Sequence, residues 1–144
     1  LKTGITLITI LLWQRWWLNM DEEPIGLREA LEQMKAEGEL PDGFLYRLIV
    51  VEGSDLQPFS TSIYGLTVSH GMELNRSSFE KDEKIFHVFD LVGFTDFDNM
   101  ANLMEDTDTL LGPIIKQSRD EGFISNASLA VHFINRPSED EDLF

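Results

Sequence analysis

The chain has no cysteine among its 144 residues. Disulfide bonds, zinc sites built on thiolates and cysteine nucleophiles are therefore excluded together. A chain of this length fits one domain, because domains most often contain about 100–150 residues. Since 42% of the residues are hydrophobic, a core can form without a stabilising metal or disulfide.

Basic residues are scarce. There are 11 Lys and Arg against 26 Asp and Glu, which gives a net charge of −15 with the three histidines neutral. Proteins that bind nucleic acid do so through clustered Lys and Arg, often with aromatic residues between them, and here the basic residues are scattered. We therefore expect no direct nucleic-acid binding by the body of the protein. Strong negative charge instead favours encounter with a basic protein partner.

Long apolar runs are also missing. The run Ile5–Trp13 has nine residues, whereas a membrane-spanning helix needs about 20. Residues 1–19 carry all three tryptophans and no acidic residue, and no small-residue cleavage site for a signal peptidase follows. Met20 begins the sequence Met-Asp-Glu-Glu-Pro, which is typical of the N-terminus of a soluble protein. We therefore treat residues 1–19 as a doubtful leader or an extra β-strand, with an interfacial anchor as the minority interpretation. A membrane association is not favoured, and the expected location is cytoplasmic.

Apolar periodicity predicts the elements of residues 20–136. A helix is expected over about 24–37, with Gly38 near its end. A longer helical pattern follows Asp96 or Asp98 as N-cap candidates and ends at Gly122. Pro113 should divide this second helix or kink it, because proline removes a backbone donor. Strands are predicted over residues 44–52, 61–74, 85–94 and 127–134, and residues 75–84 are expected to be a polar connection.

This order, α-β-β-β-α-β, indicates the α+β class: a single two-layer domain over residues 20–136. We expect an antiparallel sheet of about four strands, with helices packed on one face and an extra N-terminal strand as an option. Three successive strands on short connections predict a meander. In element order and acidity the chain resembles the class I type III secretion chaperones, cytoplasmic dimers that bind extended effector segments. The resemblance implies a protein-binding role and a possible homodimer.

Few residues are candidates for catalysis or metal binding. His70, His87 and His132 have no helical i, i+4 metal-ligand spacing, and His87 and His132 are interpreted as structural residues of strands. No phosphate-binding loop, dinucleotide fingerprint or nucleophile elbow is present. The one enzymatic hypothesis is a small hydrolase or metal-dependent enzyme that uses His70 with Asp90 or Asp96. We therefore assign no catalytic residue, no metal site and no cofactor.

The C-terminal segment, residues 137–144, is predicted to be an acidic disordered tail. Four consecutive acids precede two apolar residues in Glu139, Asp140, Glu141, Asp142, Leu143 and Phe144. We name these six as the candidate partner-binding residues, because a terminal Leu-Phe can enter an apolar pocket with a basic rim. The tail resembles the acidic, Phe-terminated tail of bacterial and phage single-stranded-DNA-binding proteins, although it lacks the proline before Phe.

These observations favour a non-catalytic acidic protein-binding module, such as a chaperone, immunity or inhibitor-like adaptor, that docks a basic partner. The alternative is a phage or replication accessory protein that recruits partners through its tail. The resemblance to single-stranded-DNA-binding proteins carries this alternative, and the enzymatic hypothesis is the third.

Overall fold

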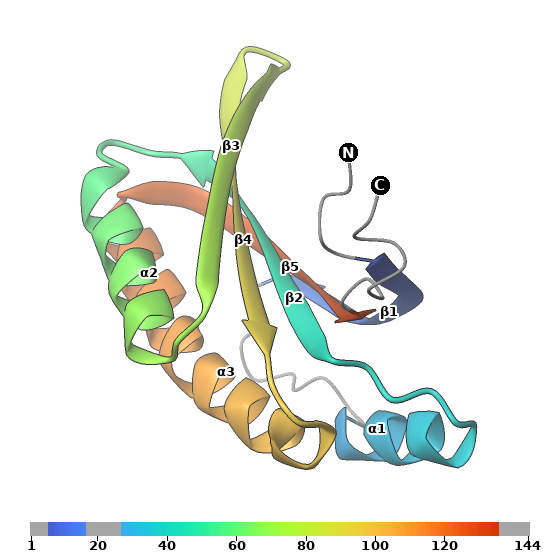
Figure 1. Ribbon diagram of the computed structural model, residues 1–144. Helices are drawn as coiled ribbons and strands as arrows, with labels where there is room; N and C mark the ends of the chain where they lie inside the picture. The colour runs from blue at the N-terminus through green and yellow to red at the C-terminus, as the bar shows by residue number, and fades with distance from the viewer. Residues whose placement is uncertain (1–5, 17–26, 136–144) are drawn as a thin grey trace, which may run out of the picture.

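A computed structural model of the chain describes residues 6–16, by their backbone, and residues 27–135 (Figure 1). The elements in chain order are β1 (Thr6–Trp16), α1 (Leu27–Ala36), β2 (Gly43–Glu52), α2 (Gln57–Ser69), β3 (Glu73–Lys81), β4 (Lys84–Phe94), α3 (Phe97–Asp120) and β5 (Ile124–Asn135).

All strand pairs are antiparallel, and the order across the sheet is β1-β5-β2-β4-β3. Strand β2 therefore lies at the centre, between β4 and β5, although it is the second strand in sequence. Only β3 and β4 are joined by a tight turn. The remaining neighbours are brought together across helices, so long-range packing decides most of the pairing.

The helices pack on one face of the sheet (Figure 1). Alternate residues of the three central strands point to this face and are fully buried, such as Tyr46 of β2, Phe89 of β4 and Phe133 of β5. The apolar side chains of all three helices complete the same core. Each such large side chain contributes roughly 1.5–3 kcal/mol when it leaves water. This burial holds the helical layer against the sheet.

Tyr46 also ties the sheet to α3 by a polar contact. Its hydroxyl donates a hydrogen bond to the carbonyl oxygen of Met104 at 3.1 Å. Because both residues are fully buried, the phenol needs this partner. The other face of the sheet carries a smaller apolar cluster of Leu45, Val92 and Ile134.

The α+β fold, the antiparallel sheet and the helices on one face are as predicted, and so are the strands at 44–52, 85–94 and 127–134 within a few residues. The backbone over residues 6–16 forms an extra N-terminal strand, one of the alternatives for residues 1–19, and it pairs with β5. Gly122 ends α3 as expected, with φ of +78°.

The predicted strand over residues 61–74 is wrong. Most of this segment is α2, in which Phe59, Ile63 and Leu66 are buried at helical spacing. Its Ser, Thr and Gly residues have little helix preference, so burial of this stripe outweighs local propensity. The meander of three successive strands is wrong for the same reason, because α2 separates β2 from β3.

The predicted polar connection over residues 75–84 is also wrong, since residues 73–81 form β3. β3 is an edge strand that pairs on one side and exposes both of its faces. Its sequence therefore shows no alternation of apolar and polar residues. Its pairing with β4 holds it in place through the two-residue turn Asp82–Glu83. Both turn residues have positive φ, 53° and 65°. This is the geometry that two-residue hairpin turns require.

Helix α3 continues through Pro113, so of the two predicted outcomes, a division or a kink, the division is wrong. The missing amide of Pro113 would have bonded the carbonyl of Thr109, one turn earlier. Both residues are exposed, so water can satisfy that carbonyl. Burial of Leu111 and Ile115 on the opposite side keeps the helix in register with the core.

Candidate functional site

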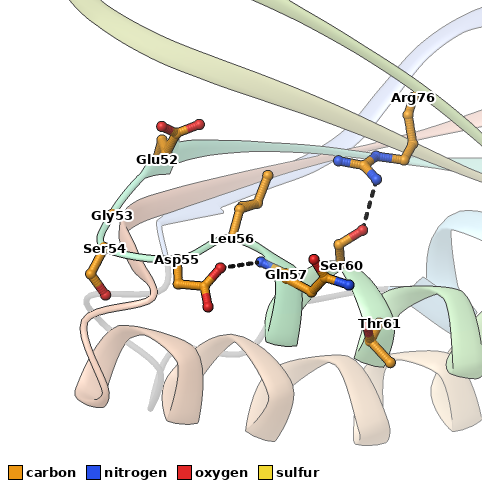
Figure 2. A pocket seen from close by; sticks show the side chains of 9 residues that line it. All are labelled: Glu52, Gly53, Ser54, Asp55, Leu56, Gln57, Ser60, Thr61 and Arg76. Carbon is orange, nitrogen blue, oxygen red and sulfur yellow. Dashed lines mark hydrogen bonds between the residues drawn. The ribbon is translucent and has the colours of Figure 1, made fainter.

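A polar pocket of about 460 Å³ opens where β2 ends and α2 begins (Figure 2). Its charged lining residues are Glu52, Asp55 and Arg76. They come from the end of β2, the following loop and β3, three segments that the sheet order brings to one end of the helical layer. The pocket therefore combines carboxylates with one guanidinium.

Arg76 is held in place on two sides. Its Nη1 donates a hydrogen bond to the hydroxyl oxygen of Ser60 at 2.7 Å (Figure 2). Its guanidinium carbon lies 4.6 Å from the centre of the Phe89 ring, a cation–π distance. The ring of Phe89 packs edge-on against Phe59 at 5.4 Å. Arg76 is thus a fixed positive charge at the rim of the pocket.

Glu52 makes a short contact with His87. The Nε2 atom of His87 lies 2.6 Å from Oε1 of Glu52, and both side chains lie on the helix-facing side of adjacent strands. The His87 side chain is 16% exposed. A histidine–carboxylate pair orients the imidazole and is a common part of acid–base sites. The prediction of His87 as structural missed this partner, which is 35 residues away in sequence.

The carboxylate of Asp55 is hydrogen bonded to the start of α2. Its Oδ1 accepts a hydrogen bond from the backbone amide of Gln57, at the start of α2, at 3.2 Å (Figure 2). It thereby satisfies one of the free amides that begin a helix. Of the hydroxyls that line the pocket, that of Ser60 accepts a hydrogen bond from Arg76 and that of Ser54 donates to the carbonyl oxygen of Gly122. The imidazole of His87, which is not part of the lining, is directed at Glu52. The arrangement can bind a small polar group, but it does not pair a hydroxyl nucleophile with a base.

A second polar cluster lies on the sheet face away from the helices. Arg47 of β2 and Asp90 of β4 are directly opposite in the register and form a two-pronged ion pair, with both N–O distances 2.9 Å. The hydrogen bond to Asp90 raises the pKa of Arg47 above its ordinary value, against the opposing effect of partial burial. Asp90 is therefore not an isolated acid in an apolar strand, because its charge is neutralised by Arg47.

His132 of β5 adds a titratable group to this face. Partial burial lowers its pKa below the ordinary value, and the positive charge of Arg47 lowers it further, while the carboxylate of Asp90 acts in the opposite direction. His132 is therefore kept neutral near pH 7. The structural interpretation of His132 fits this position in the sheet.

The residues of the enzymatic hypothesis are not brought together. His70 follows the last turn of α2 instead of lying in the strand predicted over residues 61–74, and its Nδ1 lies 3.1 Å from the Leu66 carbonyl oxygen. Asp90 points to the opposite side of the sheet, where it binds Arg47. Asp96 is the residue before α3, and its side chain makes no capping hydrogen bond. The sheet therefore separates His70 from Asp90.

Three further findings concern the tail residues, metal-binding groups and membrane-spanning helices. The six tail residues Glu139, Asp140, Glu141, Asp142, Leu143 and Phe144 lie outside it. Within residues 6–16 and 27–135, no group of three or more His, Asp or Glu side chains is arranged to hold a metal ion. No helix in the same ranges is long and apolar enough to cross a membrane.

The end of the molecule that holds α1 and the first half of α3 is strongly acidic. Arg28 joins these helices through Glu105, with N–O distances of 2.8 and 3.0 Å, and through Asn102. We call this region the acidic end. It has two basic residues, Arg28 and Lys35, and ten acidic ones: Glu29, Glu32, Glu37, Glu39, Asp42, Asp96, Asp98, Glu105, Asp106 and Asp108. All the acids except Asp108 are exposed.

Comparison with protein-family models, with curated proteins and with solved structures gives no match to this chain.

Proposed function

We propose that this chain is a non-catalytic protein-binding module that docks a basic partner, and that the acidic end is the docking surface. The observation that carries the proposal is the concentration of charge there. Ten acids and two bases give this region a formal charge of −8, about half of the −15 of the whole chain. One of its two bases is already paired with Glu105.

The charge is placed where it can act on a partner. Nine of the ten acidic residues are exposed, so they lie on the surface that a partner meets. Exposed charge of one sign raises the rate of encounter with the opposite sign and steers its orientation. Within the Debye length of about 8 Å in physiological salt, neighbouring acids on two adjacent helices reinforce one another.

The region also offers an apolar contact at its centre. A shallow pocket lies between α1 and α3. Its lining residues are the apolar Leu31, Phe97 and Ala101, the acids Glu32 and Asp98, and the two bases of the region, Arg28 and Lys35. Protein interfaces commonly combine an apolar centre with a polar rim. A basic segment with an apolar side chain between its charges fits this arrangement.

The experiment measures binding of an oligolysine peptide to the full chain by isothermal titration calorimetry, with backbone amide shifts to locate it. The test variant replaces Glu32→Gln, Glu39→Gln and Asp106→Asn at the acidic end. The matched control neutralises three acids on the β3–β4 hairpin, Glu80→Gln, Asp82→Asn and Glu83→Gln, and so changes the net charge equally.

We expect the acidic-end variant to bind roughly tenfold more weakly, because three exposed charge pairs contribute about 0.2–1 kcal/mol each. The hairpin control should bind like the original chain, and the amide shifts should fall on α1 and the first half of α3. Equal losses in the two variants would show that the charge acts diffusely, and the acidic end would then not be a docking surface.

A further inference from the structure

Strand β3 presents a long free edge. It is the last strand in the sheet order and pairs only with β4 among the described strands. Eight of its nine residues are exposed, and Leu74 is the exception. The hairpin of β3 and β4 projects beyond the helical layer (Figure 1). A free edge exposes unpaired backbone donors and acceptors that can pair with another strand.

The hairpin turn fixes which backbone groups face the free edge. Lys81 pairs with Lys84 around the two-residue turn, and the pair that closes such a turn is hydrogen bonded. Hydrogen-bonded pairs then alternate along the strand, so the odd-numbered residues of β3 bond to β4. The amides and carbonyls of the four even-numbered residues point outward: Leu74, Arg76, Ser78 and Glu80.

This pattern limits how two copies of β3 can pair about a two-fold axis, because even-numbered residues must lie opposite even-numbered ones. Axes at Arg76, Ser77 and Ser78 meet this rule with the longest overlap of the two strands. At Arg76 it places two guanidinium groups directly opposite each other, which is unfavourable. At Ser78 it places Glu73 opposite Glu83 of the other copy, outside the strand.

The axis at Ser77 uses the whole strand. Glu73 then lies opposite Lys81 of the second copy, and Lys81 opposite its Glu73, so opposite charges meet at both ends. Each of four hydrogen-bonded pairs exchanges two backbone bonds, giving about eight in total. On the face that carries Glu73 and Lys81, Phe79 lies opposite Asn75 of the second copy, and it is already stacked on Phe86 with ring centres 5.0 Å apart.

We propose that a second copy of this chain docks antiparallel on the free edge of β3, with the two-fold axis at Ser77, so that the two sheets become one. The charge on β3 suits this partner. Its two acids and two bases make the strand neutral in a chain of −15, so two copies meet where they repel least. The proposal does not depend on the acidic end, which lies beyond the C-terminal end of β4, about 20 Å along that strand from the axis at Ser77.

The other edge of the sheet is less suited to this pairing. Strand β1 pairs with β5 with register shifts between Leu7 and Leu11 and between Leu11 and Trp13. Such irregularities disrupt the ladder and increase the local twist. The pairing of β3 with β4 has no register shift. The regular edge is therefore β3, and we place the interface there.

Sedimentation velocity of the full chain across a wide concentration range, at physiological salt, tests the proposal. We expect a species of twice the 16.5 kDa mass of one chain. Glu73→Lys alone and Lys81→Glu alone each place like charges opposite and should weaken dimerisation at least about tenfold. The double variant restores both pairs with reversed polarity and should dimerise like the original chain.

A second pair of variants tests the backbone contact. Ser78→Pro removes an outward amide without removing a bond to β4, so it should abolish the dimer while circular dichroism and thermal unfolding report an intact fold. Ser78→Thr keeps the amide and serves as the control. A monomer at all concentrations, a dimer that survives Ser78→Pro, or a charge-reversed double variant that stays monomeric would each overturn the proposal.

Discussion

Removing one partner of the Arg47–Asp90 pair tests how the sheet face opposite the helices is stabilised. Arg47 is 42% exposed and Asp90 is 19% exposed, so the pair lies between the surface and the interior. In Arg47→Met the aliphatic stem is kept and the charge is removed. The carboxylate of Asp90 then remains beside apolar neighbours, with Val92 two residues along the same face and 2% exposed.

The expected cost follows from this intermediate burial. Exposed ion pairs contribute about 0–1 kcal/mol, whereas breaking a buried pair costs about 3–5 kcal/mol. We expect Arg47→Met to lower the free energy of unfolding by about 1–2 kcal/mol. Asp90→Leu should cost a similar amount, and the double variant should cost less than the sum of the two, with a coupling of about 1 kcal/mol.

Urea unfolding of the four proteins, followed by circular dichroism, measures this cycle. The two-pronged geometry is the basis of the reasoning, since it fixes both side chains in one arrangement. If the two single changes were additive, the ion pair would contribute nothing to stability, and the explanation of Asp90 in this strand would be refuted.

The pKa of His132 gives an independent readout of the same variant. Because Arg47 contributes to the lowered pKa of His132, Arg47→Met should raise that pKa toward the ordinary value of about 6.5. A base whose folded-state pKa is lowered contributes stability above its unfolded pKa. That stability is lost as the pH falls through about 6.5 toward the folded value. The chemical shifts of the histidine protons should report the higher pKa of His132 in Arg47→Met. Urea unfolding at several pH values should show that this variant loses less stability on acidification than the original chain does.

Three further predictions concern two glycines and the tail. Gly65→Ala in α2 should raise the free energy of unfolding by up to about 1 kcal/mol, because an added Cβ meets no atom within 4 Å. Gly93→Ala in β4 should lower it by about 1–3 kcal/mol, because the new Cβ would lie 2.7 Å from the buried ring of Phe44; urea unfolding of both variants checks the opposite signs. If the tail recruits partners, deleting Leu143 and Phe144 should abolish salt-dependent capture of proteins from a lysate without changing thermal unfolding. An unchanged set of captured proteins would reject the tail hypothesis.

Much of the fold could be predicted from the sequence where apolar residues recur with one clear period. The strand at 85–94 is an example: its odd-numbered residues Phe89 and Leu91 enter the core, and Asp90 lies on the other face, as alternation requires. The prediction failed in α2 and β3. There, burial of a short stripe and pairing with a neighbouring strand decide the structure, and neither leaves a strong local pattern.

The site was harder to predict than the fold, because its contacts join distant segments. Glu52 and His87 are ordinary residues in sequence and meet only because β2 and β4 are neighbours in the sheet. Arg76 looked like one scattered base, and Ser60 is 16 residues away from it. The third hypothesis from the sequence, an enzyme that uses His70 with Asp90 or Asp96, named His70 and Asp90, which lie on opposite sides of the sheet.

By itself the sequence determined the composition-dependent properties: the excess of acid, the lack of thiol chemistry and the α+β class. These properties depend on residue counts and on repeats of a few residues, because such repeats set whether a segment forms a helix or a strand. Only the tertiary structure decided that β2 is central, that β3 is the last strand in the order of the described strands, and that ten acids gather around α1 and α3. Those arrangements depend on which distant segments bury one another, and burial is a property of the whole fold.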